Sequence, residues 1–237
     1  MMEAQFYFVI EDLEFAVNAV LTLPGALKPE WFSLDESRKV TISVNENKKL
    51  RSATSKAKSG FFLHADKVSY SFLITQASGF EIGVSGLDSS QARVLMDQLG
   101  RADAVFGYVA EWDERLHRNR LTKKASYGLD EAWVGRDWRR YVPGVYWLTL
   151  VSERLLQMHN VPLEPLLAAA KSEVAKLDNG SYILRFFDSA SEWRNESRRL
   201  DDLCETVPGL FAICSVKPAF EQAGTFLETA EAIHSWR

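Results

Sequence analysis

The segment from Gly107 to Val151 constrains the fold more than any other part of the chain. Its sequence is GYVAEWDERLHRNRLTKKASYGLDEAWVGRDWRRYVPGVYWLTLV, without a helical or strand period before the apolar run Val145–Val151. A long connection without such a period is usually either functional or disordered. Disorder is not expected, because the segment carries six large aromatic rings that need burial: Trp112, Tyr127, Trp133, Trp138, Tyr141 and Trp147. We therefore predict an ordered loop that is held by its own aromatic side chains and is the first place to look for function.

Outside this segment, hydrophobic periodicity predicts alternating strands and helices. The expected strands are Gln5–Glu11, Val40–Val44, Val68–Gln76, Phe80–Ser85, Ala104–Ala110, Val145–Val151, Ser181–Phe187 and Leu210–Val216. The expected helices are one after Asp12, one that is capped by Asp88, Ser89 or Ser90 and ends at Gly100, Ser152–Met158, Leu163–Leu177, Glu192–Glu205 and Phe226–Trp236. The polar, basic stretch Asn45–Ser59 is expected to be an exposed, mobile loop.

This order of elements favours an α+β fold: a two-layer sandwich in which helices pack on one face of a mainly antiparallel sheet. No linker rich in proline, glycine or serine divides the chain, so we expect a single domain over residues 1–237. Both halves, 1–110 and 143–237, contain strand–helix–strand units, which leaves a distant internal duplication open.

Composition excludes several classes of function. The 237 residues carry a formal net charge of −4, which argues against nucleic-acid binding by bulk electrostatics. The N-terminus lacks the basic region of a signal peptide, and no apolar stretch approaches the length of a membrane span. The two cysteines have no partner at metal-ligand spacing. We expect a cytoplasmic protein with no nucleic-acid partner, no membrane partner and no cofactor.

No known catalytic signature is present, and the four histidines lie far apart in sequence. Carboxylates do gather beyond the expected strand Ala104–Ala110, where oxygen ligands can hold a divalent cation: Glu111, Asp113, Glu114, Asp130, Glu131 and Asp137. Arginines and lysines interleave with them. This pattern favours salt-bridged scaffolding first, a protein-recognition surface second and a metal site last, because Trp, Tyr and Arg dominate binding hot spots.

Several short motifs occur together and in one order: His117-Arg118-Asn119-Arg120, Val134-Gly135-Arg136-Asp137, Tyr141–Thr149, Leu184–Phe187 followed by Glu192-Trp193, and Pro208–Phe211. Together they resemble the bacterial toxin-immunity family called immunity protein 52. The resemblance covers residues 108–226, while the first hundred residues match only in general character. It implies a cytosolic antidote encoded beside a polymorphic toxin, such as a type VI secretion effector with a restriction-endonuclease-like nuclease domain. We expect the motif residues, Trp147 and Trp193 included, to be architectural.

The leading hypothesis is therefore a non-enzymatic immunity protein that binds and neutralises a cognate toxin, a nuclease. A nuclease cleft that holds phosphate is basic, so acidic and aromatic groups would complement it. The candidate toxin-binding residues are Glu111, Trp112, Asp113, Glu114, Asp130, Glu131, Asp201, Asp202 and Glu205. The alternative is a metal-dependent hydrolase that uses Glu111, Asp113 and Asp137 with His64 or His117. A small-molecule-binding domain is a third possibility, for which the sequence offers no specific motif.

Overall fold

The computed structural model describes residues 1–34, 42–56, 60–75, 79–125, 128–134, 138–207, 209–211, 213–225, 227–228 and 231. The chain forms two compact units. Unit 1 comprises residues 1–109, 150–152 and 175–183, and unit 2 comprises residues 110–149, 153–174 and 184–237.

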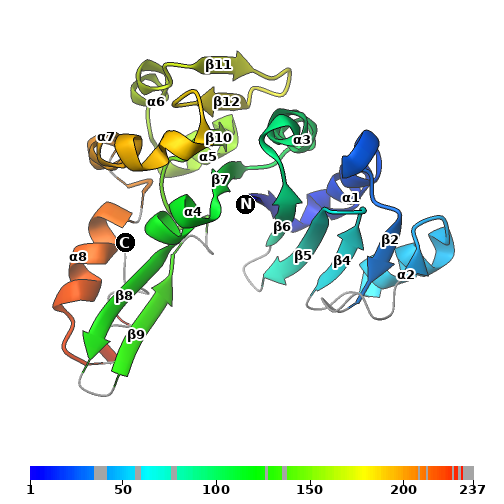
Figure 1. Cartoon of the computed structure of the whole chain (residues 1–237), viewed down its shortest axis with the longest axis horizontal. Helices are drawn as coiled ribbons and strands as arrows, with labels where there is room; N and C mark the ends of the chain where they lie inside the picture. The colour runs from blue at the N-terminus through cyan, green and yellow to red at the C-terminus, as the bar shows by residue number, and fades with distance from the viewer. Residues whose placement is uncertain are drawn as a thin grey trace. The chain divides into compact units, whose positions relative to one another are not determined.

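A sheet of ten strands in the described residues is the main element of the fold (Figure 1), in the order β11-β12-β10-β7-β1-β6-β5-β4-β2-β3. The strands are β1 Met2–Val9, β2 Trp31–Ser33, β3 Ile42–Ser43, β4 Gly60–His64, β5 Ser69–Thr75, β6 Gly79–Leu87, β7 Phe106–Glu111, β10 Leu148–Val151, β11 Glu173–Lys176 and β12 Tyr182–Arg185. The pairs β1–β6, β6–β5, β5–β4, β4–β2 and β2–β3 are antiparallel. The predicted α+β class with a mainly antiparallel sheet is confirmed.

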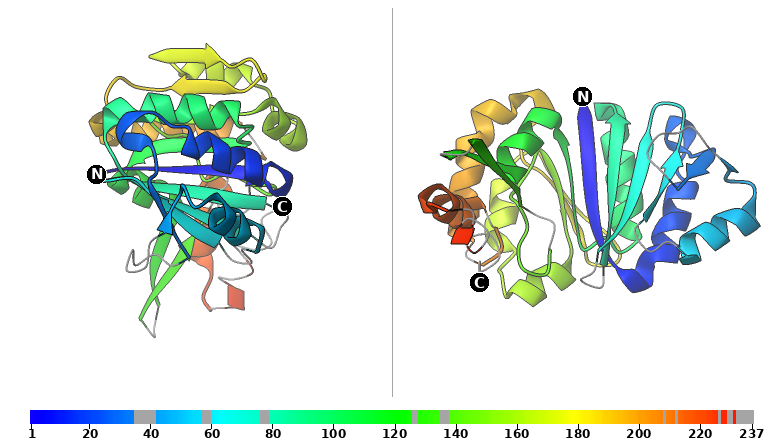
Figure 2. Two further views of the ribbon diagram at one scale, coloured as in Figure 1. Left: turned by 90° about the vertical axis from the view of Figure 1, so that its right-hand side faces the viewer. Right: turned by 90° about the horizontal axis from the view of Figure 1, so that it is seen from below.

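Aromatic residues form the core of unit 1 because strand alternation places them on one face of the sheet. Phe8 of β1 lies opposite Phe80 of β6, with their ring centroids 4.8 Å apart. Phe61 of β4 lies opposite Phe72 of β5, at 4.5 Å. All four rings are buried. The helices of unit 1 are α1 Leu13–Leu21, α2 Asn47–Lys56 and α3 Ser89–Arg101, with short 3₁₀ turns at Ile10–Asp12 and Gly25–Leu27. Figure 2 shows α1 and α3 on the same side of β1.

The predicted helix α3 begins at a capping box formed by Asp88, one of the three residues predicted as its cap. Asp88 accepts a hydrogen bond from the backbone of Gln91 at 3.1 Å, and the Gln91 side chain accepts one from the Asp88 backbone at 3.0 Å. We expect Asp88→Ala to lower the free energy of unfolding by about 1 kcal/mol, because the backbone N–H of Gln91 and the hydroxyl of Ser90 lose their acceptor. Urea denaturation measures this. Asp97→Ala on the same helix removes only an exposed pair with Arg93 and should cost less than about 0.5 kcal/mol. Equal losses in the two variants would contradict the capping role.

The segment Gly107–Val151 is not the long loop that its sequence predicts. It contains the end of β7, then α4 Trp112–Asn119 and a separate two-stranded sheet of β8 Arg120–Ala125 and β9 Gly128–Trp133. Helix α4 was not predicted because its buried residues are Glu114, Arg118 and Asn119, so that the sequence shows no apolar stripe. Among the described residues of this segment, only Val134 and residues 138–147 lie outside helices and strands.

Three further predictions are wrong. Leu163–Leu177 is not one helix: α6 spans Glu164–Ala169 and β11 follows, because Asn179-Gly180 turns β11 back onto β12 instead of ending a helix. Asn45–Ser59 is not a loop in its described part, since good helix formers such as Lys48 and Lys49 form α2 around a buried Leu50.

The third is the expected strand Leu210–Val216, most of which is replaced by α8 Ile213–Gln222. Lys123 of β8 donates to the carbonyls of Phe220 and Ala223 at 3.0 and 2.6 Å and so satisfies the end of this helix. The remaining helices of unit 2 are α5 Glu153–His159 and α7 Trp193–Thr206, with a 3₁₀ turn at Ala190–Glu192. The expected C-terminal helix Phe226–Trp236 lies almost wholly outside the described residues. Among the residues that the structure describes, no helix has the length and apolar character that crossing a membrane requires.

Candidate functional site

Helix α4 lies in unit 2 beside the β8–β9 hairpin and α7 (Figure 1), and it presents a different group of charged residues to each neighbour. Residues three or four apart share a face of a helix. Glu114 and Arg118 point inward, Trp112 and Arg115 lie toward β9, and Asp113 and His117 lie toward α7. This arrangement makes α4 the element around which the candidate site is built.

The inward face of α4 carries a buried ion pair. Both side chains of Glu114 and Arg118 are fully buried, and Oε1 of Glu114 lies 3.6 Å from Nε of Arg118. Arg118 also donates from Nη1 to Oδ1 of Asp201 on α7 at 2.7 Å, and its guanidinium lies 5.7 Å from the ring centroid of Tyr146. Oε1 of Glu114 accepts a hydrogen bond from the backbone N–H of Trp147 at 3.1 Å. One buried arginine thus ties α4, α7 and the 141–149 segment together.

Burial and charge act in opposite directions on the pKa values of this cluster. Burial raises the pKa of Glu114 to about 7, although the charge of Arg118 opposes the shift. For Asp201, burial would raise the pKa, but hydrogen bonds from His117 and Arg118 and the charge of Arg118 lower it overall. Burial would likewise lower the pKa of Arg118, yet the carboxylates of Glu114 and Asp201 help to leave it above its ordinary value. The guanidinium therefore stays charged, whereas Glu114 changes its charge near neutrality.

Asn119, the last residue of α4, joins three of the motifs that carry the family resemblance. Its backbone carbonyl accepts from the Val134 N–H at 2.8 Å, and its Nδ2 donates to the Val134 carbonyl at 3.2 Å. Its Oδ1 accepts a hydrogen bond from the Tyr146 hydroxyl at 2.6 Å. Asn119 therefore connects the backbone of Val134 to the side chain of Tyr146.

The later motifs join the same framework. The Val142 N–H donates to the Leu210 carbonyl at 2.9 Å, and the Phe186 N–H donates to the Trp147 carbonyl at 3.0 Å. Trp193 places its ring 5.6 Å from that of His117. Trp147 and Trp193 are only 6% and 7% exposed, which fits the architectural role expected of them. In the described part of the chain, the motif residues hold unit 2 together.

The side of α4 that faces β9 carries an arginine close to two tryptophan rings. The guanidinium carbon of Arg115 lies 5.6 Å from the ring centroid of Trp112 and 5.7 Å from that of Trp133. Trp112 is 39% exposed. The Trp133 Nε1 donates to Glu131 at 2.7 Å, and Glu131 also accepts from Arg120 at 2.6 Å. In this Trp112–Arg115–Trp133 stack, Trp112 is exposed, whereas Arg115 and Trp133 are half-buried.

The side of α4 that faces α7 carries paired charges. Asp113 forms an ion pair with Arg194, and Nε2 of His117 lies 3.3 Å from Oδ2 of Asp201. Beyond them on α7, Asp202 and Glu205 are exposed. The predicted carboxylates around residues 111–114 and those at residues 201–205 are far apart in the sequence. In the fold they thus lie at two adjacent helices, α4 and α7.

The structure therefore separates the predicted contact residues into two sets. Glu114 and Asp130 are buried, and Asp130 lies 3.9 Å from Lys123, so neither carboxylate is available to a partner. Trp112, Asp113, Asp202 and Glu205 are exposed, while the remaining predicted residues are half-buried or paired: Glu111, Glu131 and Asp201. Arg115 and Trp133 were not predicted as site residues. The signals that could have identified them are the i, i+3 spacing of Arg115 from Trp112 and the position of Trp133 at the end of a strand.

The residues of the hydrolase alternative are placed as follows. Asp113 is paired with Arg194, and Asp137 lies outside the described residues. His64 belongs to unit 1, where Nε2 lies 2.8 Å from the Ser33 hydroxyl and Nδ1 lies 3.2 Å from the Ser69 hydroxyl. Among the described residues, no three His, Cys, Asp or Glu side chains are grouped so that they could hold a metal ion.

Comparison with known proteins gives little further information. No family model matches the chain, and no curated protein matches it. One solved structure, a Pseudomonas aeruginosa T6SS protein, is similar over 89% of this chain and 73% of its own, at 12% identity and a TM-score of 0.49. Similarity at this level carries no conclusion about function.

Proposed function

We propose that this chain is an immunity protein that binds a cognate toxin and neutralises it through the α4 surface, defined as Trp112, Asp113, Arg115, Trp133, Asp202 and Glu205. One observation carries the proposal. Described residues of the motifs that resemble the immunity family are engaged inside unit 2, where they contact α4, while Trp112 remains exposed and Arg115 lies half-buried beside it.

The chemistry of the α4 surface suits protein recognition. Tryptophan and arginine are the residue types most enriched in binding hot spots. Because Arg115 already contacts two rings and Trp133 is hydrogen-bonded, little side-chain freedom is lost when a partner covers them. This favours a binding surface that is formed before the partner arrives.

A nuclease is the class of toxin that the charges support best. Asp202 and Glu205 expose carboxylates on α7, next to the helix that carries Trp112. A cleft that binds a nucleic-acid backbone is lined with cations, and opposing carboxylates would accelerate association and fix orientation. The T6SS name of the structural neighbour is compatible with this role but, at a TM-score of 0.49, adds no support to it.

The direct experiment uses the product of the open reading frame next to the gene for this chain. We expect that product to stop the growth of a bacterial host when expressed alone, and co-expression of this chain to restore growth. Titration calorimetry with the purified proteins should give a stoichiometric complex. Absence of both rescue and binding, with a demonstrably toxic neighbour, would refute the proposed function.

Within that complex, we expect Trp112→Ala to weaken binding at least tenfold, or roughly 1.4 kcal/mol or more, because an anchoring ring is lost. The matched control is Leu129→Ala, which removes another exposed apolar side chain (60% exposed) from β9 itself. The control should bind like the wild type, and both variants should keep the wild-type Tm. If the Trp112 variant binds with wild-type affinity, the toxin contacts a surface other than α4.

A further inference from the structure

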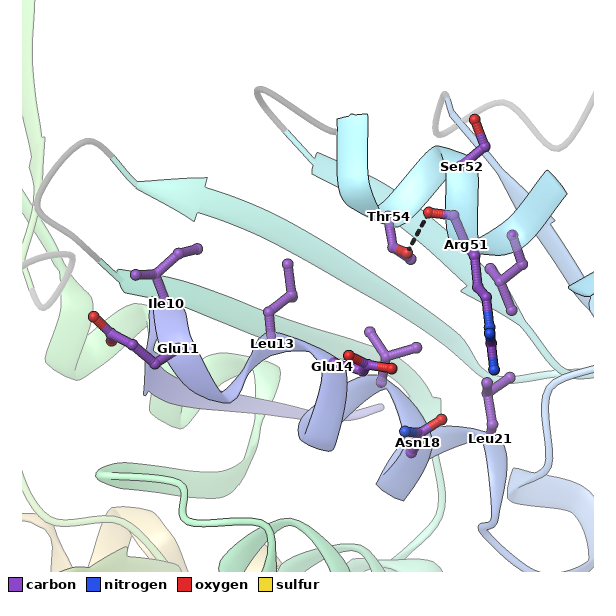
Figure 3. Close-up of a pocket in the computed structure, with 11 residues that line it drawn as sticks. Ile10, Glu11, Leu13, Glu14, Asn18, Leu21, Arg51, Ser52 and Thr54 are labelled. Atoms are coloured by element: carbon purple, nitrogen blue, oxygen red, sulfur yellow. Dashed lines mark hydrogen bonds between the residues drawn. The ribbon is translucent and has the colours of Figure 1, made fainter. Parts of the chain in front are cut away.

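A groove of about 750 Å³ lies between α1 and α2, entirely within unit 1 (Figure 3). Its apolar lining comes from Ile10, Leu13, Val17 and Leu21 on one side and Leu50 on the other. Val17 and Leu50 are buried, whereas Leu13 and Leu21 remain half-buried. Apolar side chains in the groove are therefore only partly covered by the fold.

The groove follows the whole length of α1. Leu13, Val17 and Leu21 of α1 are related as i, i+4 and i+8, which is one stripe of a helix, and Ile10 extends this stripe from the preceding 3₁₀ turn. At 1.5 Å per residue this stripe is roughly 16 Å long, or about three helical turns. An elongated ligand matches this length better than a compact small molecule does.

Charges of opposite sign lie on the two walls. Glu11 and Glu14 line the α1 side, and Arg51 lines the α2 side, from which Figure 3 shows it extending toward Leu21. All three are exposed, and within the described part of the chain none of them takes part in an ion pair. The charges near α4 are largely paired, so these three stand out as groups that a ligand can neutralise.

We propose that the groove binds an amphipathic helix of a partner protein. The apolar stripe of that helix would pack on Leu13, Val17, Leu21 and Leu50, as in helix-in-groove recognition. A lysine or arginine on one flank would face Glu11 and Glu14, and a carboxylate on the other flank would face Arg51. A single helix supplies the length, the apolar stripe and both charges. This inference is independent of the toxin and of the α4 surface.

The test uses two synthetic helical peptides of roughly 18 residues, long enough to exceed the groove. Both carry the same leucine stripe, one flanked by lysine on one side and glutamate on the other, and one flanked by glutamine on both sides. They are titrated into the full chain labelled at its leucine methyl groups and observed by NMR. The methyl resonances of Leu13, Leu21 and Leu50 should shift, while those of Leu155 and Leu200 in unit 2 should not.

Variants then identify the source of binding. We expect the charged peptide to bind several-fold more tightly than the glutamine peptide at low salt, and the double variant Glu14→Gln/Arg51→Gln to remove this difference. Asn18→Trp places a ring in the groove from an exposed position. This variant should abolish the methyl shifts that both peptides cause. If that variant has a lowered Tm, Glu14→Trp fills the groove from the neighbouring turn.

Four results would overturn the proposal. Saturating shifts that survive both groove-filling variants would place the peptide elsewhere, and absence of shifts at millimolar peptide would exclude a helix. Shifts caused by octyl glucoside but by neither peptide would assign the groove to a small amphiphile. Self-association that Asn18→Trp abolishes would make the groove an interface between two copies of this chain.

Discussion

Replacing Arg118 by alanine should lower the free energy of unfolding by about 3–5 kcal/mol, because it leaves the fully buried Glu114 beside a cavity and without its counter-charge. Asp201 loses its 2.7 Å hydrogen bond in the same variant. Urea denaturation at pH 8, where Glu114 is ionised, measures the effect. The loss should be smaller at pH 5, since a protonated Glu114 needs no counter-charge.

The matched control is Arg120→Ala, only two residues away. Arg120 pairs with Glu131 at 2.6 Å, but both side chains are 36% exposed, so its loss should cost less than about 1 kcal/mol. A second variant, Glu114→Gln/Arg118→Met, removes both buried charges and should recover part of the stability that Arg118→Ala loses. If Arg118→Ala costs no more than Arg120→Ala, the buried pair does not hold unit 2 together.

The dependence on Arg118 explains why part of the fold could be predicted from the sequence and part could not. Strands β5 and β6 alternate Phe, Tyr and Ile with other residues, and this period of two indicates a face that is buried by apolar packing. Strand β1 is recognisable instead by its continuous apolar run Phe6–Val9, which is buried throughout. Asp88 and Gln91 at the start of α3 form a local motif that depends on nothing distant. Elements of this kind can be predicted from their own stretch of sequence.

Helix α4 is different because its inward residues are charged. A hydrophobic period cannot reveal a helix whose inner face is Glu114, Arg118 and Asn119, and the partners that make burial of these groups tolerable come from distant parts of the chain. The same holds for the candidate site. Carboxylates near α4 could be identified from the sequence, but whether each lies at the surface depends on pairings that only the fold establishes. Glu114 and Asp113 are one residue apart, yet the first is buried and the second is exposed.

The motifs that carry the family resemblance also fail to identify the surface that a partner contacts. Their residues are engaged in contacts between segments, as Asn119 is with Val134 and Tyr146. A pattern of this kind identifies a framework, and it does not mark the surface that a partner contacts. The stack of Trp112, Arg115 and Trp133 could not be predicted, because it forms only where the fold brings β9 beside α4.

The pH dependence of stability offers the sharpest test of the buried cluster. The folded-state pKa of Glu114 is about 7, against an ordinary value of 4.5, because burial disfavours the carboxylate. Between these pH values the folded state holds a proton that the unfolded state has released. The corresponding contribution to stability is fully present below pH 4.5 and is lost as the pH rises through 7. The difference corresponds to about 3 kcal/mol.

This contribution is isolated by comparison with Glu114→Gln, which resembles the protonated side chain in shape and lacks the titration. We expect the free energy of unfolding of the wild type, minus that of the variant, to fall by about 3 kcal/mol between pH 4.5 and pH 8. Histidines and other carboxylates titrate in both proteins, so their effects cancel in the difference. A difference that stays constant over this range would mean that the attraction of Arg118 fully offsets burial. Glu114 would then be an ordinary carboxylate, and the smaller loss expected for Arg118→Ala at pH 5 would disappear with it.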